Sequence, residues 1–279
     1  MSNVLIPCFN RPAFLHHCLD KITKAEGSDK HHYVFRLDQG YDPKNLAVIE
    51  AFPLSKEVTF TPKTKYTTGK QSFSVLSGLM YAATTERVYL IEDDVMIARD
   101  FFKWHEAVHA DNDLFSSHAN FNVNSTGPTG WYDEYYLTQG DYSSIGTCLS
   151  AKALEAIAPH VRPEYFTDPT RYIKRHFPDH PLSAAYSEQD GLIRRLAGPM
   201  AYPCQMDLDN LSYGPRCFHA GFVGKNRPHQ SAQLTAEYLS RVIYDQQNMR
   251  VLATQEGYYL DSRPVCLDLP QWTKLQRKD

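Results

Sequence analysis

The sequence predicts an α/β protein built on a mostly parallel, doubly wound sheet flanked by helices. Short apolar runs at 4–8, 33–37, 58–60 and 88–91 alternate with segments of helical periodicity, and such alternation favours a parallel sheet. The last of these runs ends in Glu92-Asp93-Asp94. Carboxylates at the C-terminal end of a buried strand lie where open α/β sheets bind their ligands.

The first third of the chain is the most regular part. The continuous apolar run 4–8 is typical of a central strand that is covered on both faces. Two helices are expected between the first four strands, each with one apolar face. The first begins near Asn10 and Pro12 and the second precedes the run 88–91; their apolar faces comprise Phe14, Leu15, Cys18, Leu19 and Ile22, and Phe73, Leu76, Met80 and Ala83.

Later elements are less regular. A helix is expected over 101–108, strands over 119–123 and 145–149, and a short helix capped by Ser150. Residues 159–186, rich in Pro, His, Tyr and Arg, are expected to form a long surface loop. A further helix should follow Ser187, and another is marked near the C-terminus by Leu234, Tyr238, Val242 and Met249.

Composition sets broad limits on function. The 279 residues are 42% hydrophobic and 22% charged, which is ordinary for a globular protein. The net charge of -3 argues against a broadly basic nucleic-acid surface, although a local one is possible. The six cysteines include no C-x-x-C pair, so free buried thiols are favoured over disulfides or zinc.

The N-terminus leads directly into an apolar strand, and no apolar stretch approaches the ~18 residues of a membrane span. We therefore expect no signal peptide and no anchor, and a reducing cytoplasmic location in a bacterium or a virus-infected cell.

Asp93 and Asp94 are the first candidate site residues. Divalent cations that bind diphosphates prefer hard oxygen ligands. One carboxylate on the metal and its neighbour on a ribose would suit a nucleotide-sugar enzyme, because the metal neutralises the charge that grows on a departing diphosphate. A solvated turn or a structural calcium site is the alternative interpretation.

Two further candidates lie at the same predicted edge of the sheet. Asp38 ends the second strand and could accept hydrogen bonds from a nucleobase or a ribose, or simply form a turn before Gly40. Arg11 follows the first strand near a helix N-terminus and could contact phosphate or base, or be an ordinary surface arginine.

Asp190 and Glu188 are candidates for a general base. They lie at a predicted helix start, where a carboxylate could take the proton of an acceptor hydroxyl. Ser187 and Asp190 also fit a capping box, which is the structural alternative. His219 is a candidate metal ligand or diphosphate contact, although a lone histidine is more often structural. Segment 162–181 mixes cations with aromatics and is the best candidate for an acceptor-facing loop, with a solvated loop as the alternative.

Taken together, these motifs resemble a glycosyltransferase of the GT-A fold, and within that fold the N-acetylglucosaminyltransferase I family. The resemblance covers roughly residues 3–224, and Ile91-Glu92-Asp93-Asp94-Val95 followed by Asp100-Phe101-Phe102 is its most specific segment. The other similar segments, in chain order, are 4–11, 18–21, 36–40, 187–195, 213–214 and 219–221.

The resemblance implies a role for each candidate. Asp94 becomes the ligand of Mn²⁺ or Mg²⁺, helped by His219, and Asp93 becomes a ribose contact. Asp38 becomes a base contact and Arg11 a nucleotide contact. The base is Asp190 or Glu188, because the family has adjacent aspartates between tryptophans where this chain has Glu188-Gln189-Asp190.

The sequence therefore predicts one GT-A-like unit and a metal-dependent, inverting glycosyltransferase. Residues 1–110 would bind the nucleotide sugar, 111–224 would bind the acceptor and carry catalysis, and 225–279 would form a helical C-terminal extension. The donor would be a nucleoside diphosphate sugar, with UDP as the expected nucleotide, and the acceptor a hydroxyl of a glycan, a protein or a hydroxymethylated base in viral DNA. A sugar nucleotidyltransferase and a non-catalytic nucleotide-sugar-binding module are the two rival functions.

Overall fold

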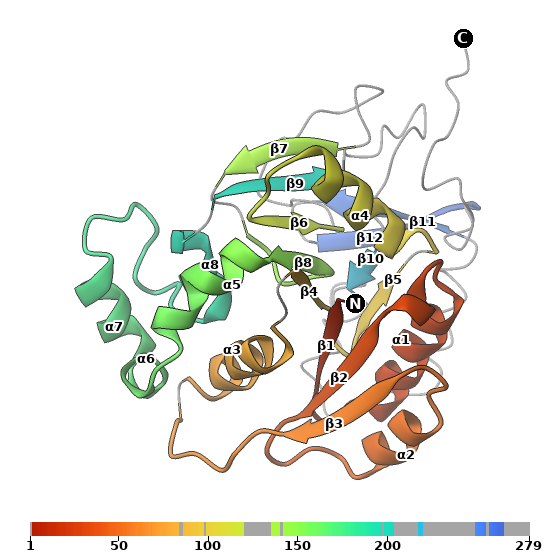
Figure 1. Ribbon diagram of the computed structural model, residues 1–279, viewed down its shortest axis with the longest axis horizontal. Coiled ribbons are helices and arrows are strands. Elements are labelled where there is room, and N and C mark those ends of the chain that lie inside the picture. Colours follow the sequence, from red (N-terminus) through yellow and green to blue (C-terminus); the bar gives the residue numbers. More distant parts are fainter. Residues whose placement is uncertain are drawn as a thin grey trace.

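An eight-stranded mixed sheet forms the centre of the protein (Figure 1). The computed structural model describes residues 2–67, 69–83, 86–97, 99–119, 135–139, 142–196, 198–203, 217–219, 249–254 and 257–264. The large sheet contains β1 (Asn3–Cys8), β2 (His32–Leu37), β3 (Lys56–Phe60), β4 (Arg87–Leu90), β6 (Ser116–His118), β7 (Tyr135–Gln139), β8 (Thr147–Ser150) and β9 (Pro199–Pro203). The described part of the chain also contains two small sheets, formed by β5 (Val95–Ile97) with β10 (Cys217–His219) and by β11 (Met249–Thr254) with β12 (Gly257–Pro264).

Helices connect these strands and cover the large sheet. They are α1 (Pro12–Lys24), α2 (Lys44–Glu50), α3 (Lys70–Ala82), α4 (Phe101–Asp111), α5 (Ala151–Ile157), α6 (Pro163–Thr167), α7 (Pro169–His176) and α8 (Gln189–Leu196), with short 3₁₀ turns η1 (Ser28–Lys30) and η2 (Ala158–His160). The predicted α/β class, with a mostly parallel mixed sheet between helices, is confirmed.

The strand order is β3-β2-β1-β4-β8-β6-β9-β7. The first four strands are parallel, and β8 then joins β4 and β6 in antiparallel pairs. The β3-β2-β1-β4 half has the order of a Rossmann-like nucleotide-binding sheet. The direction of winding reverses between β1 and β4, and open α/β sheets bind ligands at the carboxyl ends of the strands at such a switch point.

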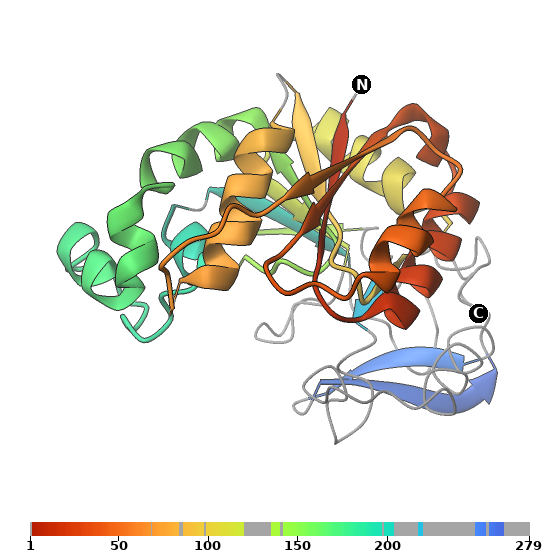
Figure 2. The same cartoon turned by 90° about the horizontal axis from the view of Figure 1, so that it is seen from below.

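Each face of the sheet has its own hydrophobic core. Val4, Ile6 and Cys8 of β1 pack into a core with α1, α2 and α4, whereas Leu5 packs into a second core with α3 and α5 to α8. Figure 2 shows α1 and α2 on one side of β1 to β3 and α3 on the other. Because β-strand side chains alternate between faces, an unbroken apolar run is what a sheet covered on both faces requires.

The N-terminal elements follow the sequence prediction closely, with one correction on α3. All five predicted apolar positions of α1 are buried. On α3, Leu76 is buried as predicted, but Phe73 and Met80 are only half-buried and Ala83 lies beyond the helix end. Ser72 is buried instead, because it forms hydrogen bonds with α8 that apolar periodicity does not reveal.

The prediction of a long loop over 159–186 is wrong for 163–176, which form α6 and α7, whereas 177–186 contain no helix or strand. Pro163 and Pro169 each occupy a first helical turn, and Asp168 caps α7 by accepting a 2.9 Å hydrogen bond from the amide of Arg171. Proline is pre-organised for this position. Tyr165 and Tyr172 are buried in the second core, so they do not line an acceptor-facing loop.

Other expectations have mixed outcomes. Ser150 caps α5 as predicted, through a 3.3 Å hydrogen bond from the amide of Ala153. The strand expected over 119–123 is not tested, because 120–134 lie outside the described residues; β6 ends just before it, at His118. In the predicted helical extension 225–279, the described residues are strands β11 and β12. Of the residues that marked a helix there, Met249 begins β11 instead, and Leu234, Tyr238 and Val242 lie outside the description.

The described cysteines match a further expectation. Cys8, Cys18, Cys148 and Cys217 are free and buried, as predicted. Cys204 and Cys266 lie outside the described residues. No helix in the described part of the chain has the length and apolar character needed to cross a membrane.

Candidate active site

The switch point of the sheet gathers most of the predicted site residues. Phe9 and Arg11 follow β1, Asp38 follows β2, and the acidic tripeptide 92–94 follows β4. Backbone hydrogen bonds extend the strand pairing beyond the strand ends. The amide of Asp38 donates to Cys8 O at 2.9 Å, and the amide of Ile91 donates to Leu5 O at 3.0 Å.

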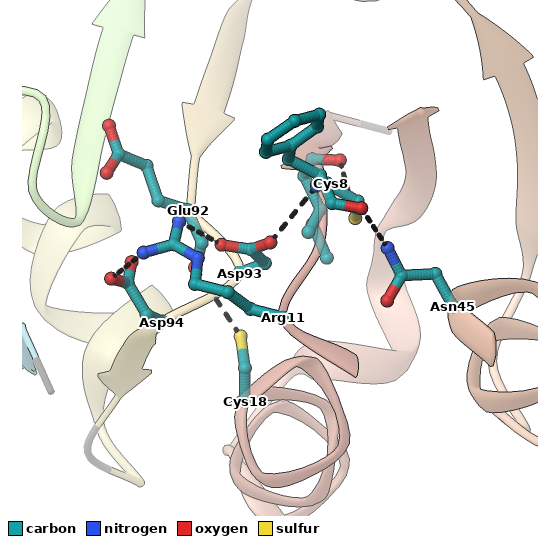
Figure 3. Close-up of polar contacts among 9 residues, drawn as sticks. Cys8, Arg11, Cys18, Asn45, Glu92, Asp93 and Asp94 are labelled. Atoms are coloured by element: carbon teal, nitrogen blue, oxygen red, sulfur yellow. Dashed lines mark hydrogen bonds and ion pairs between the residues drawn. The ribbon is translucent and has the colours of Figure 1, made fainter. Parts of the chain in front are cut away.

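Arg11 bridges the two aspartates. Its guanidinium donates to Oδ1 of Asp93 at 2.5 Å and to Oδ2 of Asp94 through its other terminal nitrogen (Figure 3). Both carboxylates are fully buried, and 21% of the Arg11 side chain is exposed. Burial acts to lower the pKa of Arg11, but the two carboxylates raise it above its usual value. Arg11 is therefore a permanent cation that holds both aspartates.

Asp93 also accepts a backbone hydrogen bond, 3.3 Å from the amide of Phe9. Burial raises its pKa, the guanidinium of Arg11 lowers it, and the neighbouring Asp94 raises it. Two buried carboxylates share one guanidinium, so burial favours protonation of Asp93 while the charge of Arg11 opposes it.

Glu92 has a different orientation from its two neighbours. Figure 3 shows its carboxylate pointing away from the Arg11–Asp93–Asp94 cluster. Its negative charge raises the pKa of Asp190, so it lies within electrostatic range of that residue. No role was predicted for Glu92 from the sequence. Because Asp93 and Asp94 form a turn closed by a 2.9 Å hydrogen bond from the amide of Val95 to Glu92 O, no strand alternation separates Glu92 from its neighbours.

Asp190 lies in the first turn of α8 and faces the 142–147 turn. Its Oδ2 accepts a 3.3 Å hydrogen bond from Ser144 Oγ, and its buried Oδ1 has no hydrogen-bond partner among the described residues. Burial, and then the charge of Glu92, raise the pKa of Asp190 to about 7, although Ser144 and Arg194 act to lower it. A carboxylate with this pKa can exchange protons near neutral pH.

The capping-box interpretation of Ser187 and Asp190 is wrong. Ser187 Oγ lies 3.0 Å from Thr170 Oγ1, while the Asp190 side chain is bonded to Ser144. The first amide of α8, that of Gln189, donates instead to Ser72 Oγ at 3.0 Å. Because a serine of α3 accepts the hydrogen bond from this first amide, the Asp190 carboxylate does not serve as the cap of α8.

Glu188, the second candidate base, is exposed, and its backbone carbonyl accepts the amide of Leu192 at 3.0 Å. Position 191 requires a glycine because the backbone packs closely there. A Cβ there would lie 2.1 Å from the carbonyl oxygen of Tyr186, which no other residue could avoid without moving the backbone. Asp190 is thus fixed between two constrained positions, and Glu188 faces solvent.

Asp38 lies at the rim of the switch point beside two residues that the sequence analysis missed. It is half-buried and accepts the amide of Gln39 at 2.7 Å, which supports its turn-forming interpretation without excluding a ligand on its other oxygen. Phe9 is 40% exposed, and Lys70 Nζ lies 5.8 Å from the centre of its ring and 3.1 Å from Gln39 O. An exposed phenylalanine directly after a buried strand was the available signal.

His219 is described only by its backbone. It pairs with Val95 in the antiparallel β5–β10 sheet, which brings it next to the residue that follows Asp94. The predicted proximity of His219 to Asp94 is therefore present along the backbone, and the position of its side chain lies outside the described residues.

The described side chains are compatible with a divalent ion whose remaining oxygen ligands come from the substrate and from water. Among the described residues, no three His, Cys, Asp or Glu side chains lie close enough to hold a metal ion by themselves. Mg²⁺ and similar ions commonly take one or two protein carboxylates and complete their coordination with substrate phosphates and water. Asp94 can supply such a carboxylate, and Arg11 would compete with the ion for it.

Comparisons with known proteins give a general likeness in fold. No family model matches the chain, and no curated protein matches it. Solved structures similar to it include a mannosyltransferase from Pyrobaculum calidifontis in complex with GDP-Man and Mn²⁺, with 13% identity over 56% of this chain and 46% of that one at a TM-score of 0.43. TarS of S. aureus shows 16% identity over 72% and 58% at a TM-score of 0.49.

A UDP-glucose pyrophosphorylase complexed with UDP-glucose is also similar, with 8% identity over 87% of this chain and 97% of that one at a TM-score of 0.45. The chain spans about half the length of the mannosyltransferase and TarS chains. The similar structures thus include glycosyltransferases and nucleotidyltransferases, and the likeness concerns the fold alone. The resemblance to the N-acetylglucosaminyltransferase I family stays a prediction.

Proposed function

We propose that the protein is a metal-dependent, inverting glycosyltransferase that moves a sugar from a nucleoside diphosphate, UDP in our assignment, to a hydroxyl acceptor. The observation that carries the proposal is that the acidic tripeptide at the switch point links two sets of residues. The tripeptide after β4 binds Arg11 on one side, through Asp93 and Asp94, and acts through Glu92 on Asp190 on the other. The proposed donor site and the proposed base are therefore linked electrostatically through Glu92.

Asp190 is the proposed general base. It takes the proton of the acceptor hydroxyl, whose oxygen then attacks the anomeric carbon of the sugar while the bond from that carbon to the diphosphate oxygen breaks. The unpartnered Oδ1 and the pKa of about 7 suit this role. Glu188 is the second candidate, and its exposed position makes it the weaker one.

The residues at the sheet edge would bind the donor. Asp94, with His219 beside the following residue, would hold Mn²⁺ or Mg²⁺, which when bound supplies charge neutralisation for the departing diphosphate. Asp93 is proposed to contact the ribose and Asp38 the base. Arg11, at the N-terminal end of α1, is positioned to give one of its hydrogen bonds to the nucleotide instead of to Asp94.

A donor screen by thermal shift tests this function. We expect UDP-sugars with Mn²⁺ to raise the melting temperature, by an amount equivalent to about 2.7 kcal/mol at a ligand concentration of about 100 Kd. Asp94→Asn should lose the metal-dependent part of the shift. Lys24→Gln, which changes an exposed residue on α1, is the control and should keep it.

Two outcomes would contradict the proposal. Stabilisation by no nucleoside diphosphate sugar, with or without metal, would remove the donor assignment. Stabilisation by a nucleoside triphosphate with a sugar phosphate, and by no nucleoside diphosphate sugar, would support the rival nucleotidyltransferase. Against that rival, the segment 7–12 at the end of β1 lacks the glycine-rich loop that such enzymes ordinarily use.

The acceptor can be tested through the exposed basic face of α7. Arg171, Lys174 and Arg175 are exposed there, and the first turn of α7 is joined to Ser187 by the 3.0 Å contact with Thr170. If the acceptor is DNA with a hydroxymethylated base, acceptor affinity should fall steeply with salt, and the double variant Lys174→Gln/Arg175→Gln should reduce the slope by about 2. A slope near zero in the unmodified protein would favour a neutral glycan.

A further inference from the structure

The turn formed by residues 142–147 connects the buried centre of the sheet to Asp190. It precedes β8, and its Gly146 has a φ of +58°, a left-handed conformation that favours glycine. The Gly146 carbonyl accepts the amide of Ala119 at 2.8 Å. On the other side of the turn, the carbonyl of Tyr142 accepts a 2.8 Å hydrogen bond from Nε of Arg194 in α8. The turn is therefore anchored to both β6 and α8.

His118 fixes the turn from the side of β6. It is fully buried, and its Nδ1 lies 2.8 Å from Ser143 O and 3.1 Å from Thr147 Oγ1. Because a carbonyl only accepts, Nδ1 carries the proton, which leaves Nε2 to accept from Ser116 Oγ at 2.9 Å. The ring also stacks on Tyr202 at 4.5 Å. Burial lowers the pKa of His118 to about 3, so it stays neutral and keeps this tautomer at physiological pH.

Ser144 carries the connection to Asp190. It directly follows the residue that His118 holds, and it is buried. Its Oγ donates to Asp190 Oδ2 at 3.3 Å, and both its side chain and its backbone act to lower the pKa of that carboxyl. The hydroxyl engages Oδ2 of Asp190, and Oδ1 has no hydrogen-bond partner among the described residues. Such an arrangement presents one carboxylate oxygen to an incoming proton.

We propose that Ser144 is a positioning residue for Asp190, and that His118 acts on the same carboxylate through Ser143 by locking the 142–147 turn. The proposal rests on the function proposed above, in which Asp190 is the base. It assigns a task to a buried histidine that neither binds the donor nor transfers the proton.

The effect of Ser144 on proton transfer has a definite sign. The charged and titratable groups that act on Asp190 are Glu92 after β4, which raises its pKa, and Arg194 of α8, which lowers it. Tyr142 and Tyr165, which also lie within electrostatic range of Asp190, have raised pKa values and are neutral. Ser144 donates to the charged carboxylate, so removing its hydroxyl raises the pKa of Asp190. The base is then protonated up to a higher pH.

Ser144→Ala is the central test. We expect kcat at pH 7 to fall about 10-fold, the KM for the donor to stay unchanged, and the rising limb of the kcat–pH profile to move to higher pH, so that activity recovers in alkaline buffer. Ser150→Ala is the matched control, because it removes a serine hydroxyl that caps α5 and does not contact Asp190. It should lower stability by about 1 kcal/mol and leave the pH profile in place.

Variants of His118 test the second step. His118→Asn keeps a donor for Ser143 O and should retain most of the activity, whereas His118→Leu should reproduce the shifted pH profile of Ser144→Ala. A folded Ser144→Ala protein with an unchanged pH profile and kcat would overturn the proposal. Titration of the Asp190 carboxyl by ¹³C NMR, with Asp190→Asn to assign the signal, gives the same answer without turnover. If no nucleotide sugar is a substrate, this titration still decides the positioning role, so the two failures are distinguishable.

Discussion

Replacing Arg11 by methionine is expected to destabilise the protein by about 3 to 5 kcal/mol at pH 8, because it leaves two buried carboxylates without their shared cation. Asp93 is 1% exposed and Asp94 is fully buried, so water cannot take over the role of the guanidinium. The loss should be smaller at pH 5, because burial raises the pKa of Asp93 to about 7, so that its carboxyl in the folded chain is protonated there and is charged at pH 8. Chemical denaturation at pH 5 and pH 8 measures the difference.

The same variant tests whether the site accepts a divalent ion. Without Arg11, the Asp93 and Asp94 carboxylates should bind Mn²⁺ more tightly than in the unmodified protein, and Mn²⁺ should restore part of the lost stability. Arg171→Met, at an exposed position on α7, should change stability by no more than about 0.5 kcal/mol. Equal stability of the Arg11 variant and this control at pH 8 would show that the pairing contributes nothing.

Replacing Asp190 by asparagine is expected to reduce turnover by about 100- to 10,000-fold while donor binding is retained, because it removes the proposed proton acceptor and preserves the shape of the side chain. Glu188→Gln is the matched control and should have a small effect, since Glu188 is exposed. Single-turnover kinetics together with donor thermal shifts separate the chemical step from binding. Full turnover by the Asp190 variant would exclude it as the base and favour Glu188 or a binding module.

Asp190→Asn should also make the protein more stable at pH 8. The folded-state pKa of about 7 lies above the ordinary value of 3.8, so between these pH values the folded chain binds more protons than the unfolded chain. Stability therefore falls as pH rises from about 4 to about 7. Since Asp190 is partly accessible to solvent, we expect the substitution to recover about 1 to 2 kcal/mol at pH 8, and to remove this part of the pH dependence.

The sequence predicted the N-terminal half of the fold well because local and global signals agree there. An apolar run such as 4–8 suits only a strand covered on both faces, and the five apolar positions of α1 match one buried face. Helices α6 and α7 were missed because their polar and aromatic composition hides short buried segments. Their proline starts and the Asp168 cap were the readable signals.

The candidate site was predictable in its members and less so in its connections. Residues 92–94 and Arg11 were expected at one edge of the sheet, and the structure places them there. That Arg11 bonds to both aspartates depends on pairing between segments 83 residues apart, which no local pattern encodes. The link from Asp190 to Ser144 is likewise a contact between distant segments.

Because Arg11 forms hydrogen bonds to both aspartates, the metal ion and the donor are expected to bind in a particular order. In the protein without donor, Asp93 and Asp94 are already paired with Arg11, so they are expected to have little affinity for a free metal ion. The cation is then expected to enter together with the diphosphate, whose own negative oxygens draw the guanidinium aside. Arrival of the donor would thus open the metal position, and an enzyme without its sugar nucleotide would stay unloaded.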